Sequence, residues 1–560
     1  MKLPRKRLSD RRLSVIPRVI RKSSPYFEVF EADEETLKQF NQIAERLNPD
    51  NNQEPMQFKL KISKASQREL NALRQLFFKV DYQLSPGFQK AILKEKGVGK
   101  FAELKLRKSD LILKPIGFLE LEEIKSILTY NSKEKQFHAR IMDYYAILEF
   151  LEKKRYPVIT HFSLNFKLPS EYANQLQLDM VLREYQEDAL HRWRGAKKRG
   201  VVVLPTGGGK TIVALEAIRQ LAETTLIVVP TLDLLSQWRE ALEVLLHVPD
   251  VGVLGGGTKK LQPITVATYD SASMLANHHV TVFGFLIFDE VHHLPSPTYR
   301  LSAELSLAPH RLGLTATPER FDELHQDLDR LVGPTVYRIA PKLLEKRGFL
   351  APYEIRRIET TLKPEEKARY DSHMRIFRNY TRTLDDIEPG WQFDTIVKRT
   401  VFDPDAREAL SNLEKARRVA LEASEKIDHV EALLQQHIDE KVIVFSRYTK
   451  VVEHLSDLFG VPLITHKTKA PERDRILRHF KSGLLTKIVT GQVLDEGIDV
   501  PDASVGVIIS GTGSKREFIQ RLGRLLRPQK EQAILYELVT EATLEDGHSR
   551  RRQFEEEEPD

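Results

Sequence analysis

The stretch Leu204-Pro205-Thr206-Gly207-Gly208-Gly209-Lys210-Thr211 lies between a β-rich run and a helix-length segment. Its glycines free backbone N–H groups to approach a triphosphate, and the helix that follows turns its positive end toward the phosphates. Lys210 can reach the β and γ phosphates, and Thr211 can hold Mg²⁺. The strict phosphate-loop pattern has glycine where this chain has Leu204, so the strand before and the helix after carry the prediction. We expect ATP and Mg²⁺ at Thr206, Gly207, Gly208, Gly209, Lys210 and Thr211; the alternative is a glycine-rich turn that contains Gly-Lys-Thr by chance.

Outward from this loop, short apolar runs alternate with helix-length segments, a pattern typical of a parallel sheet covered on both faces. One block has candidate strands at 200–204, 225–229, 264–268, 285–288 and 311–315, with helical patterns at 211–223 and 232–246. A second block has candidate strands at 353–358, 441–446, 462–465, 487–490, 505–510 and 534–538. Runs this apolar predict strands buried on both faces. The sequence therefore predicts an α/β fold with two parallel-sheet domains in tandem and a ligand site at their interface.

The flanking regions are less regular. The predicted boundaries are 1–108 for an N-terminal accessory region of unknown role, 109–175 for a small α+β domain, 176–345 and 346–545 for the two α/β domains, and 546–560 for a charged tail. Helical patterns are expected near 34–47, 66–79 and 143–154, with a turn at Pro86-Gly87 and a strand-like run at 159–166. A helical, highly charged insertion begins at Pro364-Glu365-Glu366, whose acids suit a helix start, and continues to about Asp439.

Composition narrows the class of protein. A chain of 560 residues with 41% hydrophobic and 30% charged residues is expected to form several globular domains. Because it has no cysteine, disulfides, thiolate metal sites and a cysteine nucleophile are excluded, which is compatible with a reducing cytoplasm. No apolar run reaches membrane-helix length, so no membrane span is expected. The net charge of +6 favours a polyanionic partner, and residues 2–22 form a basic arm for phosphates, a solvated terminus or a transit peptide.

Asp289-Glu290-Val291-His292 follows a strand-sized apolar run. This position places its side chains at the carboxyl edge of the predicted sheet, where ligands bind in such folds. Asp289 is expected to bind the Mg²⁺ held by Thr211, and Glu290 to orient and activate the attacking water. The rival interpretation is a metal site made by His292 and His293, but adjacent residues rarely share one metal and no zinc-protease spacing is present.

Gln520-Arg521-Leu522-Gly523-Arg524-Leu525-Leu526-Arg527 lies in the second α/β block. Arg524 and Arg527 are three residues apart and therefore share one helical face. A guanidinium brought across the domain cleft would stabilise transition-state charge only when the domains close, which couples hydrolysis to motion. We predict Gln520, Arg524 and Arg527 as catalytic residues; a solvated basic helix is the alternative.

The chain resembles the superfamily 2 helicases, specifically the archaeal and bacterial relatives of the XPB DNA repair helicase, from about residue 110 to 545. The form of the Gln520–Arg527 stretch and of 493–501 points to XPB. The other supporting motifs are Leu182-Arg183-Glu184-Tyr185-Gln186, Val229-Pro230-Thr231-Leu232-Asp233, Ala267-Thr268-Tyr269-Asp270-Ser271 and Leu314-Thr315-Ala316-Thr317-Pro318. The resemblance implies RecA-like parallel-sheet domains at 176–345 and 346–545, with a helical thumb at about 364–405.

The resemblance also implies roles for individual residues. Arg183 and Gln186 would contact adenine, Gly497 and Asp499 would face the nucleotide, and His292, Thr315 and Thr317 would couple the ATP state to the grip on DNA. The nucleic-acid backbone would be contacted by Pro230, Thr231, Thr268, Phe445, Ser446 and Arg447. Residues 109–175 resemble the family's damage-recognition domain. The chain departs from the family at Arg320-Phe321-Asp322, where Phe321 replaces the acid of an Arg-Glu-Asp motif to which the family's unwinding role is attached.

Three functions follow as hypotheses. The first is an ATP-dependent DNA helicase or translocase of 3′-to-5′ polarity in DNA repair, acting on duplex or single-stranded DNA. The second is the motor of a restriction or phage-defence complex, which would require a partner nuclease because no nuclease constellation stands out in the sequence. The third is a DNA-opening scaffold without turnover. RNA as the substrate stays open, because a motor that follows phosphates touches few bases.

Overall fold

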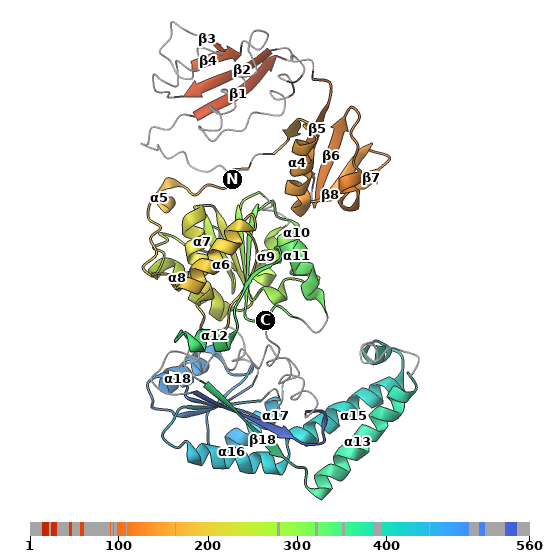
Figure 1. Cartoon of the computed structure of the whole chain (residues 1–560), viewed down its shortest axis with the longest axis vertical. Coiled ribbons are helices and arrows are strands. Elements are labelled where there is room, and N and C mark those ends of the chain that lie inside the picture. The colour runs from red at the N-terminus through yellow and green to blue at the C-terminus, as the bar shows by residue number, and fades with distance from the viewer. Residues whose placement is uncertain are drawn as a thin grey trace.

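The computed structural model describes residues 14–21, 24–30, 44–46, 56–60, 90, 93, 98–107, 109–162, 164–276, 281–319, 323–349, 353–384, 395–446, 448–491, 503–509 and 533–545. The described chain forms two parallel-sheet domains, a helical arm and two smaller sheets (Figure 1). The α/β prediction is therefore confirmed. No helix among these residues combines the length and apolarity that a bilayer crossing requires.

The first α/β domain, called domain 1, is built on an eight-stranded sheet of order β13-β12-β14-β11-β15-β16-β10-β17. All neighbouring strands are parallel except the hairpin of β12 and β13. The strands are β10 (Arg199–Val203), β11 (Thr225–Val229), β12 (Gly252–Gly255), β13 (Thr258–Lys260), β14 (Ile264–Thr268), β15 (Phe285–Asp289), β16 (His310–Thr315) and β17 (Thr335–Arg338). The central strands are buried throughout, as their continuous apolar runs predict.

Helices cover both faces of this sheet, because a buried strand needs apolar cover on each side. Figure 1 shows α6 (Glu184–Gly195), α7 (Lys210–Leu221) and α8 (Leu232–Val244) on one side. On the other side lie α9 (Tyr269–Ala276), α10 (Leu301–Glu304) and α11 (Leu328–Leu331). The short helix α12 (Pro341–Lys346) leads toward the second domain.

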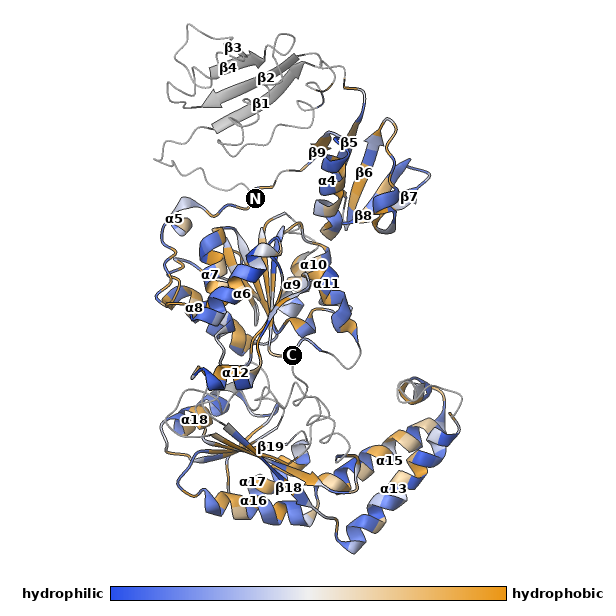
Figure 2. Ribbon diagram, viewed as in Figure 1, coloured by the Kyte–Doolittle hydropathy of each residue, from blue (hydrophilic) through white to orange (hydrophobic). Residues whose placement is uncertain are grey.

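The second α/β domain, called domain 2, has six parallel strands in the order β18-β23-β22-β19-β21-β20. These are β18 (Tyr353–Thr360), β19 (Val442–Phe445), β20 (Leu463–Ile464), β21 (Lys487–Thr490), β22 (Val505–Ile508) and β23 (Ala533–Thr540). Its helices include α16 (Ser424–Gln436), α17 (Thr449–Phe459) and α18 (Ala470–Lys481). Figure 2 shows mainly hydrophobic strands in both sheets and many hydrophilic residues on the helices around them. One hydrophobic cluster contains buried residues of both domains.

The helical arm consists of α13 (Pro364–Arg382) and α15 (Pro404–Leu421), which project from domain 2 (Figure 1). Tyr370 and Met374 of α13 pack against Leu413 and Ala416 of α15. The thumb at 364–405 that the resemblance implies includes α13 but only the first two residues of α15. The arm that the structure describes extends to Leu421.

The α+β unit, called the accessory domain, has a sheet of order β7-β8-β6-β5-β9 and the helix α4 (Tyr144–Lys153). Its strands are β5 (Phe101–Arg107), β6 (Asp110–Ile116), β7 (Thr129–Asn131), β8 (Gln136–Arg140) and β9 (Val158–Thr160). Strands β5 and β6 form an antiparallel hairpin, so a boundary at 108/109 divides two paired strands. The unit therefore begins at least as early as Phe101.

A four-stranded sheet of order β1-β2-β4-β3 precedes the accessory domain. Its strands are β1 (Ser14–Arg21), β2 (Ser24–Phe30), β3 (Ala44–Arg46) and β4 (Met56–Leu60). The expected helix near 34–47 is wrong at Ala44–Arg46, which pairs antiparallel with β4. Local spacing cannot reveal such long-range pairing. The expected helix at 66–79, the Pro86-Gly87 turn and the tail at 546–560 lie outside the described residues.

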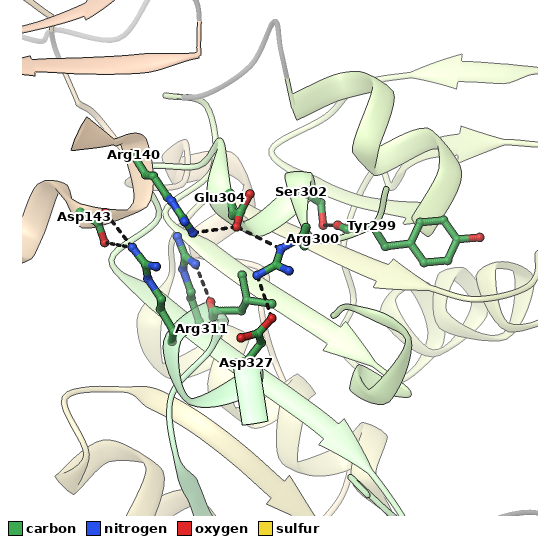
Figure 3. A network of polar contacts seen from close by, with 10 residues as sticks. Arg140, Asp143, Tyr299, Arg300, Ser302, Glu304, Arg311 and Asp327 are labelled. Carbon is green, nitrogen blue, oxygen red and sulfur yellow. Dashed lines mark hydrogen bonds and ion pairs between the residues drawn. The ribbon is translucent and has the colours of Figure 1, made fainter. Parts of the chain in front are cut away.

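The accessory domain is joined to domain 1 by apolar and charged contacts. Leu305 and Leu307 of domain 1 belong to the accessory core. Arg140 Nη1 lies 3.1 Å from Glu304 Oε1, and Arg330 Nη2 lies 3.2 Å from Asp143 Oδ2. Figure 3 shows this network beside Arg300, which contacts both Glu304 and Asp327.

Arg311 is fully buried in the same region although it occupies the strand β16. Its guanidinium donates to the backbone oxygens of Leu331, Ser306 and Ala308. Burial lowers its pKa. These carbonyl acceptors make a buried cation tolerable inside an otherwise apolar strand.

Candidate active site

The predicted phosphate loop leaves the carboxyl end of β10 and enters α7, which confirms the strand–loop–helix context. Gly207 and Gly209 have φ of +79° and +73°, a backbone region that favours glycine. A Cβ at Gly208 would lie 2.9 Å from the oxygen of Pro205. Lys210 Nζ donates to the oxygen of Leu204 at 3.3 Å, so this ammonium lies over the loop. The loop is thus shaped as an anion cradle.

Residues of the 182–186 motif support this loop from α6. Gln186 is 4% exposed, and its Nε2 donates to the oxygen of Gly208 at 3.2 Å. Its Oε1 accepts from the backbone N–H of Arg183 at 2.9 Å. Tyr185, which sequence reasoning did not assign to the site, donates its hydroxyl to the oxygen of Gly208 at 2.9 Å. Its place between the two predicted adenine contacts was the available signal.

Arg183 also reaches toward domain 2. Its Nη1 donates to the oxygen of Phe349 at 3.2 Å, and its guanidinium lies 5.2 Å from the centre of the Phe349 ring. A second link between the domains joins Arg473 Nη2 to Asp233 Oδ2 at 3.4 Å. The candidate loop therefore lies near residues that contact the second domain.

Asp289 ends β15, at the same sheet edge as the phosphate loop, and is 6% exposed. Trp238 Nε1 donates to its Oδ2 at 2.8 Å, and the backbone N–H of Glu290 donates to its Oδ1 at 3.0 Å. Burial raises the pKa of Asp289, opposed by the Trp238 hydrogen bond and the charge of Lys210. Sequence reasoning missed Trp238, because the contact spans 51 residues.

Glu290, His292, Thr315 and Thr317 form one polar group beside Asp289. Thr315 Oγ1 lies 3.1 Å from His292 Nδ1 and within 3.5 Å of Glu290 Oε2. It also accepts from the backbone N–H of Thr317 at 3.1 Å. Glu290 has φ of +45°, an unusual conformation for a residue with a side chain, of the kind that clusters at functional sites. The structure thus unites four residues predicted from two separate motifs.

The oxygen donors here suit a hard cation. Mg²⁺ in nucleotide sites is held by one or two protein oxygens plus the phosphates. Thr211, on the first turn of α7, and Asp289 are the residues that would supply such oxygens from one sheet edge, since β15, β16 and β10 are neighbours. The rival interpretation is a metal site made by His292 and His293. In the structure, His292 Nδ1 contacts the Thr315 hydroxyl. Among the described residues, no group of three or more His, Asp or Glu side chains is placed to hold a metal.

The predicted nucleic-acid contacts divide into two groups. Thr231 caps α8 by accepting from the N–H of Leu234 at 3.3 Å, Pro230 precedes it, and Thr268 ends β14. Phe445 and Ser446 are each 0% exposed, and their contact with nucleic acid stays a prediction. Phe445 is the last residue of the buried strand β19, and its apolar ring belongs to the core.

Several predicted residues lie outside the described part of the chain. They are Arg320, Phe321, Asp322, Arg447, Gly497, Asp499, Gln520, Arg524 and Arg527.

Comparison with known proteins gives two family matches. Residues 179–320 match the family described as "Type III restriction enzyme, res subunit", and residues 407–555 match "ERCC3/RAD25/XPB C-terminal helicase". The helicase domain of Hef from Pyrococcus furiosus aligns with 66% of this chain and 98% of its own, at 18% identity and a TM-score of 0.43, too distant to inform function.

Three curated relatives cover about two thirds of this chain. The "DNA 3'-5' translocase XPB2" of Sulfurisphaera tokodaii is 43% identical over 378 residues, which span 66% of this chain and 84% of the relative. The "DNA 3'-5' helicase XPB" of Mycobacterium tuberculosis is 32% identical over 66% of this chain and 63% of the relative. The "Putative DNA 3'-5' helicase Rad25" of Halobacterium salinarum is 34% identical over 67% of this chain and 57% of the relative. With these matches and a phosphate loop joined to Asp289 and Glu290 at one sheet edge, the chain belongs to the XPB family of helicases.

Proposed function

We propose that this protein is an ATP-dependent DNA translocase or helicase of 3′-to-5′ polarity that serves DNA repair. One observation carries the proposal: three neighbouring strands deliver the phosphate loop, the Glu290–Thr315 contact and Asp289 to one sheet edge. The phosphate loop would bind the negative charge of the triphosphate. The hydrogen bonds of Thr315 would connect the Glu290 carboxylate to His292 and Thr317. The names of the XPB relatives support DNA as the track and the polarity.

In this proposal the loop glycines and Lys210 hold the triphosphate, while Thr211 and Asp289 supply oxygens to Mg²⁺. The bound ion would neutralise charge on the transferring phosphoryl group. Glu290 would orient the attacking water, since phosphoryl transfer depends chiefly on positioned charge. Gln186 and Tyr185 would keep the loop in shape through the Gly208 carbonyl, with Gln186 and Arg183 beside the adenine.

Domain 2 would complete the site. Arg524 and Arg527 would approach the γ phosphate, with Gln520, Gly497 and Asp499 nearby, only when the domains close. The Asp233–Arg473 and Arg183–Phe349 contacts support an arrangement in which the two domains face each other across the nucleotide. Closure and opening of that interface would be the motor stroke.

The proposal is tested by replacing the lysine of the phosphate loop. Lys210→Ala should abolish DNA-stimulated ATP hydrolysis, because the main positive charge at the phosphates is removed. Lys259→Ala is a matched control, since Lys259 is an exposed lysine of the hairpin strand β13. Undiminished hydrolysis by Lys210→Ala would refute the assignment of the site.

The identity of the nucleic-acid substrate is tested in a separate experiment. ATP hydrolysis should be measured with duplex DNA, single-stranded DNA and RNA at one defined salt concentration, since phosphate binding depends strongly on salt. We expect stimulation by DNA. Stimulation by RNA alone would overturn the DNA assignment.

A second candidate is the motor of a restriction complex, favoured by the match of residues 179–320 to a restriction subunit. That function requires a partner nuclease. DNA cleavage that appears only when the protein is purified with a bound partner, and that Lys210→Ala removes, would support it over repair.

A further inference from the structure

Trp238 contacts Asp289 from a part of domain 1 that the proposed ATP chemistry does not otherwise use. Its indole is 2% exposed, and its Nε1 donates to Asp289 Oδ2 at 2.8 Å. The other carboxylate oxygen, Oδ1, accepts from the backbone N–H of Glu290 at 3.0 Å. With one donor on each oxygen, the plane of this carboxylate is set by two different segments of the chain.

The helix α8, which carries Trp238, also carries a proposed nucleic-acid contact at its start and a contact to domain 2. Thr231, a proposed nucleic-acid contact, caps the start of α8, and Trp238 follows about two turns later, roughly 10 Å along the axis. Asp233 in the first turn lies 3.4 Å from Arg473 of domain 2. If the first turn of α8 shifts and the helix moves as one rigid body, Trp238 shifts with it. The hydrogen bond from Trp238 would then displace the Asp289 carboxylate.

A second aromatic residue makes a comparable link. Tyr269 starts α9 directly after Thr268, the other proposed nucleic-acid contact of domain 1. Its hydroxyl donates to the backbone oxygen of Asp289 at 3.0 Å. Both proposed nucleic-acid segments of domain 1 thus reach the same residue through one buried aromatic hydrogen bond each.

We propose that Trp238 is a positioning residue: it orients the Asp289 carboxylate for Mg²⁺ and carries displacement of α8 to that carboxylate when nucleic acid binds. The first half rests on the Trp238–Asp289 contact, and the second half rests also on the proposed function. Partners that hold a metal ligand from behind set its orientation and affinity, and their loss typically weakens metal binding 10–100-fold.

The test compares two buried tryptophans of domain 1. Trp238→Phe removes the indole N–H and keeps an aromatic ring in the core. Trp193→Phe is the matched control: Trp193 is 1% exposed, and its Nε1 donates to the backbone oxygen of Arg311 at 2.9 Å. Each variant therefore loses one buried indole hydrogen bond, but only the bond lost in Trp238→Phe is made to Asp289.

The first readout is binding and requires no turnover. Binding of a fluorescent, non-hydrolysable ATP analogue to the full chain is followed by anisotropy while Mg²⁺ is titrated. We expect Trp238→Phe to need roughly tenfold more Mg²⁺ than wild type, as for other partners behind a metal ligand. Trp193→Phe should match wild type. Equal Mg²⁺ dependence in all three proteins would overturn the proposal.

The second readout is coupling. The ratio of ATP hydrolysis with and without duplex DNA, at saturating Mg²⁺, should fall in Trp238→Phe and hold in Trp193→Phe. If wild type is stimulated and both variants respond equally, the relay is refuted while the proposed function stands. If wild type is not stimulated by nucleic acid, the proposed function fails, and the Mg²⁺ titration still decides whether Trp238 positions Asp289.

A third measurement covers the case in which Trp238→Phe does not fold. Trp193→Phe retains Trp238 and Trp391, so its tryptophan emission should change when Mg²⁺ is added in the presence of an unlabelled, non-hydrolysable analogue. The same addition to a Trp193→Phe, Asp289→Asn double variant should give a much smaller change. An unchanged emission in Trp193→Phe would count against the contact.

Discussion

The ammonium group of Lys426 lies 2.6 Å from Glu545 Oε2 inside domain 2, where the two side chains are 0% and 9% exposed. Lys426 Nζ also donates to the backbone oxygen of Ile509 at 2.8 Å. Burial lowers the pKa of Lys426, while the charge of Glu545 opposes that shift. The pair joins α16 to the chain after β23 and to Ile509, which precedes the segment that carries Arg524 and Arg527.

Lys426→Met should therefore destabilise domain 2 by about 3–5 kcal/mol, because removal of one partner leaves a buried, uncompensated charge. Calorimetric unfolding of the full chain measures the effect. Lys197→Met is the control, since the Lys197–Glu149 pair is 79% and 72% exposed and exposed pairs contribute little. A domain 2 transition at the wild-type temperature in Lys426→Met would contradict this prediction.

Gly209→Ala should weaken nucleotide binding. A Cβ at this position collides with Gln186 Nε2, and the left-handed backbone costs a non-glycine residue about 1–2 kcal/mol, so affinity should fall roughly tenfold. Titration calorimetry with an ATP analogue measures the loss. Gly257→Ala is the control, since Gly257 also has positive φ but nothing lies within 4 Å of its Cβ position. Wild-type affinity in Gly209→Ala would argue against a tight loop.

Thr315→Val should slow DNA-stimulated hydrolysis. It removes the hydroxyl that contacts Glu290 and His292 while keeping the buried volume nearly constant. One hydrogen bond contributes about 1 kcal/mol, which corresponds to roughly fivefold in kcat. Thr315→Ser keeps the hydroxyl and should stay near wild type. The idea fails if the serine and valine variants are equally slow.

The accessory domain should lose stability in acid because of Glu103. Its burial raises the pKa, but hydrogen bonds from Lys90 and Lys105 outweigh this and lower it to about 2. His161 Nε2 lies 3.2 Å from the same carboxylate. A depressed pKa contributes stability above the unfolded value of 4.5, and that stability is lost as the pH falls toward about 2.

Thermal unfolding at pH 6 and at roughly pH 3 checks this, with Glu103→Gln as the comparison. The variant should unfold at a lower temperature than wild type at pH 6. The difference between the two unfolding temperatures should be smaller at roughly pH 3. A constant gap across this range would mean that Glu103 does not titrate as described.

Local sequence patterns predict the buried strands and the phosphate loop of the α/β domains more accurately than the elements of the N-terminal region. Thr225–Val229 and Ile264–Thr268 were predicted at their observed bounds because a buried parallel strand must be apolar along its whole length. Local spacing at Ala44–Arg46 predicts helix, and the structure shows a strand, because pairing with β4 is a long-range contact. The resemblance assigns Phe445 to nucleic acid, and the structure buries its side chain at the end of the strand β19, so that assignment stays a prediction.

By itself, the sequence determined the α/β class, the tandem order of the domains and the place of the phosphate loop, because apolar runs and a Gly-Lys-Thr turn are local features. Tertiary structure alone decided the contacts between distant segments. Trp238 meets Asp289 across 51 residues, and Lys426 meets Glu545 across 119. Such pairs depend on which helix packs on which strand, and the periodicity of a single sequence shows a buried face without identifying its partner.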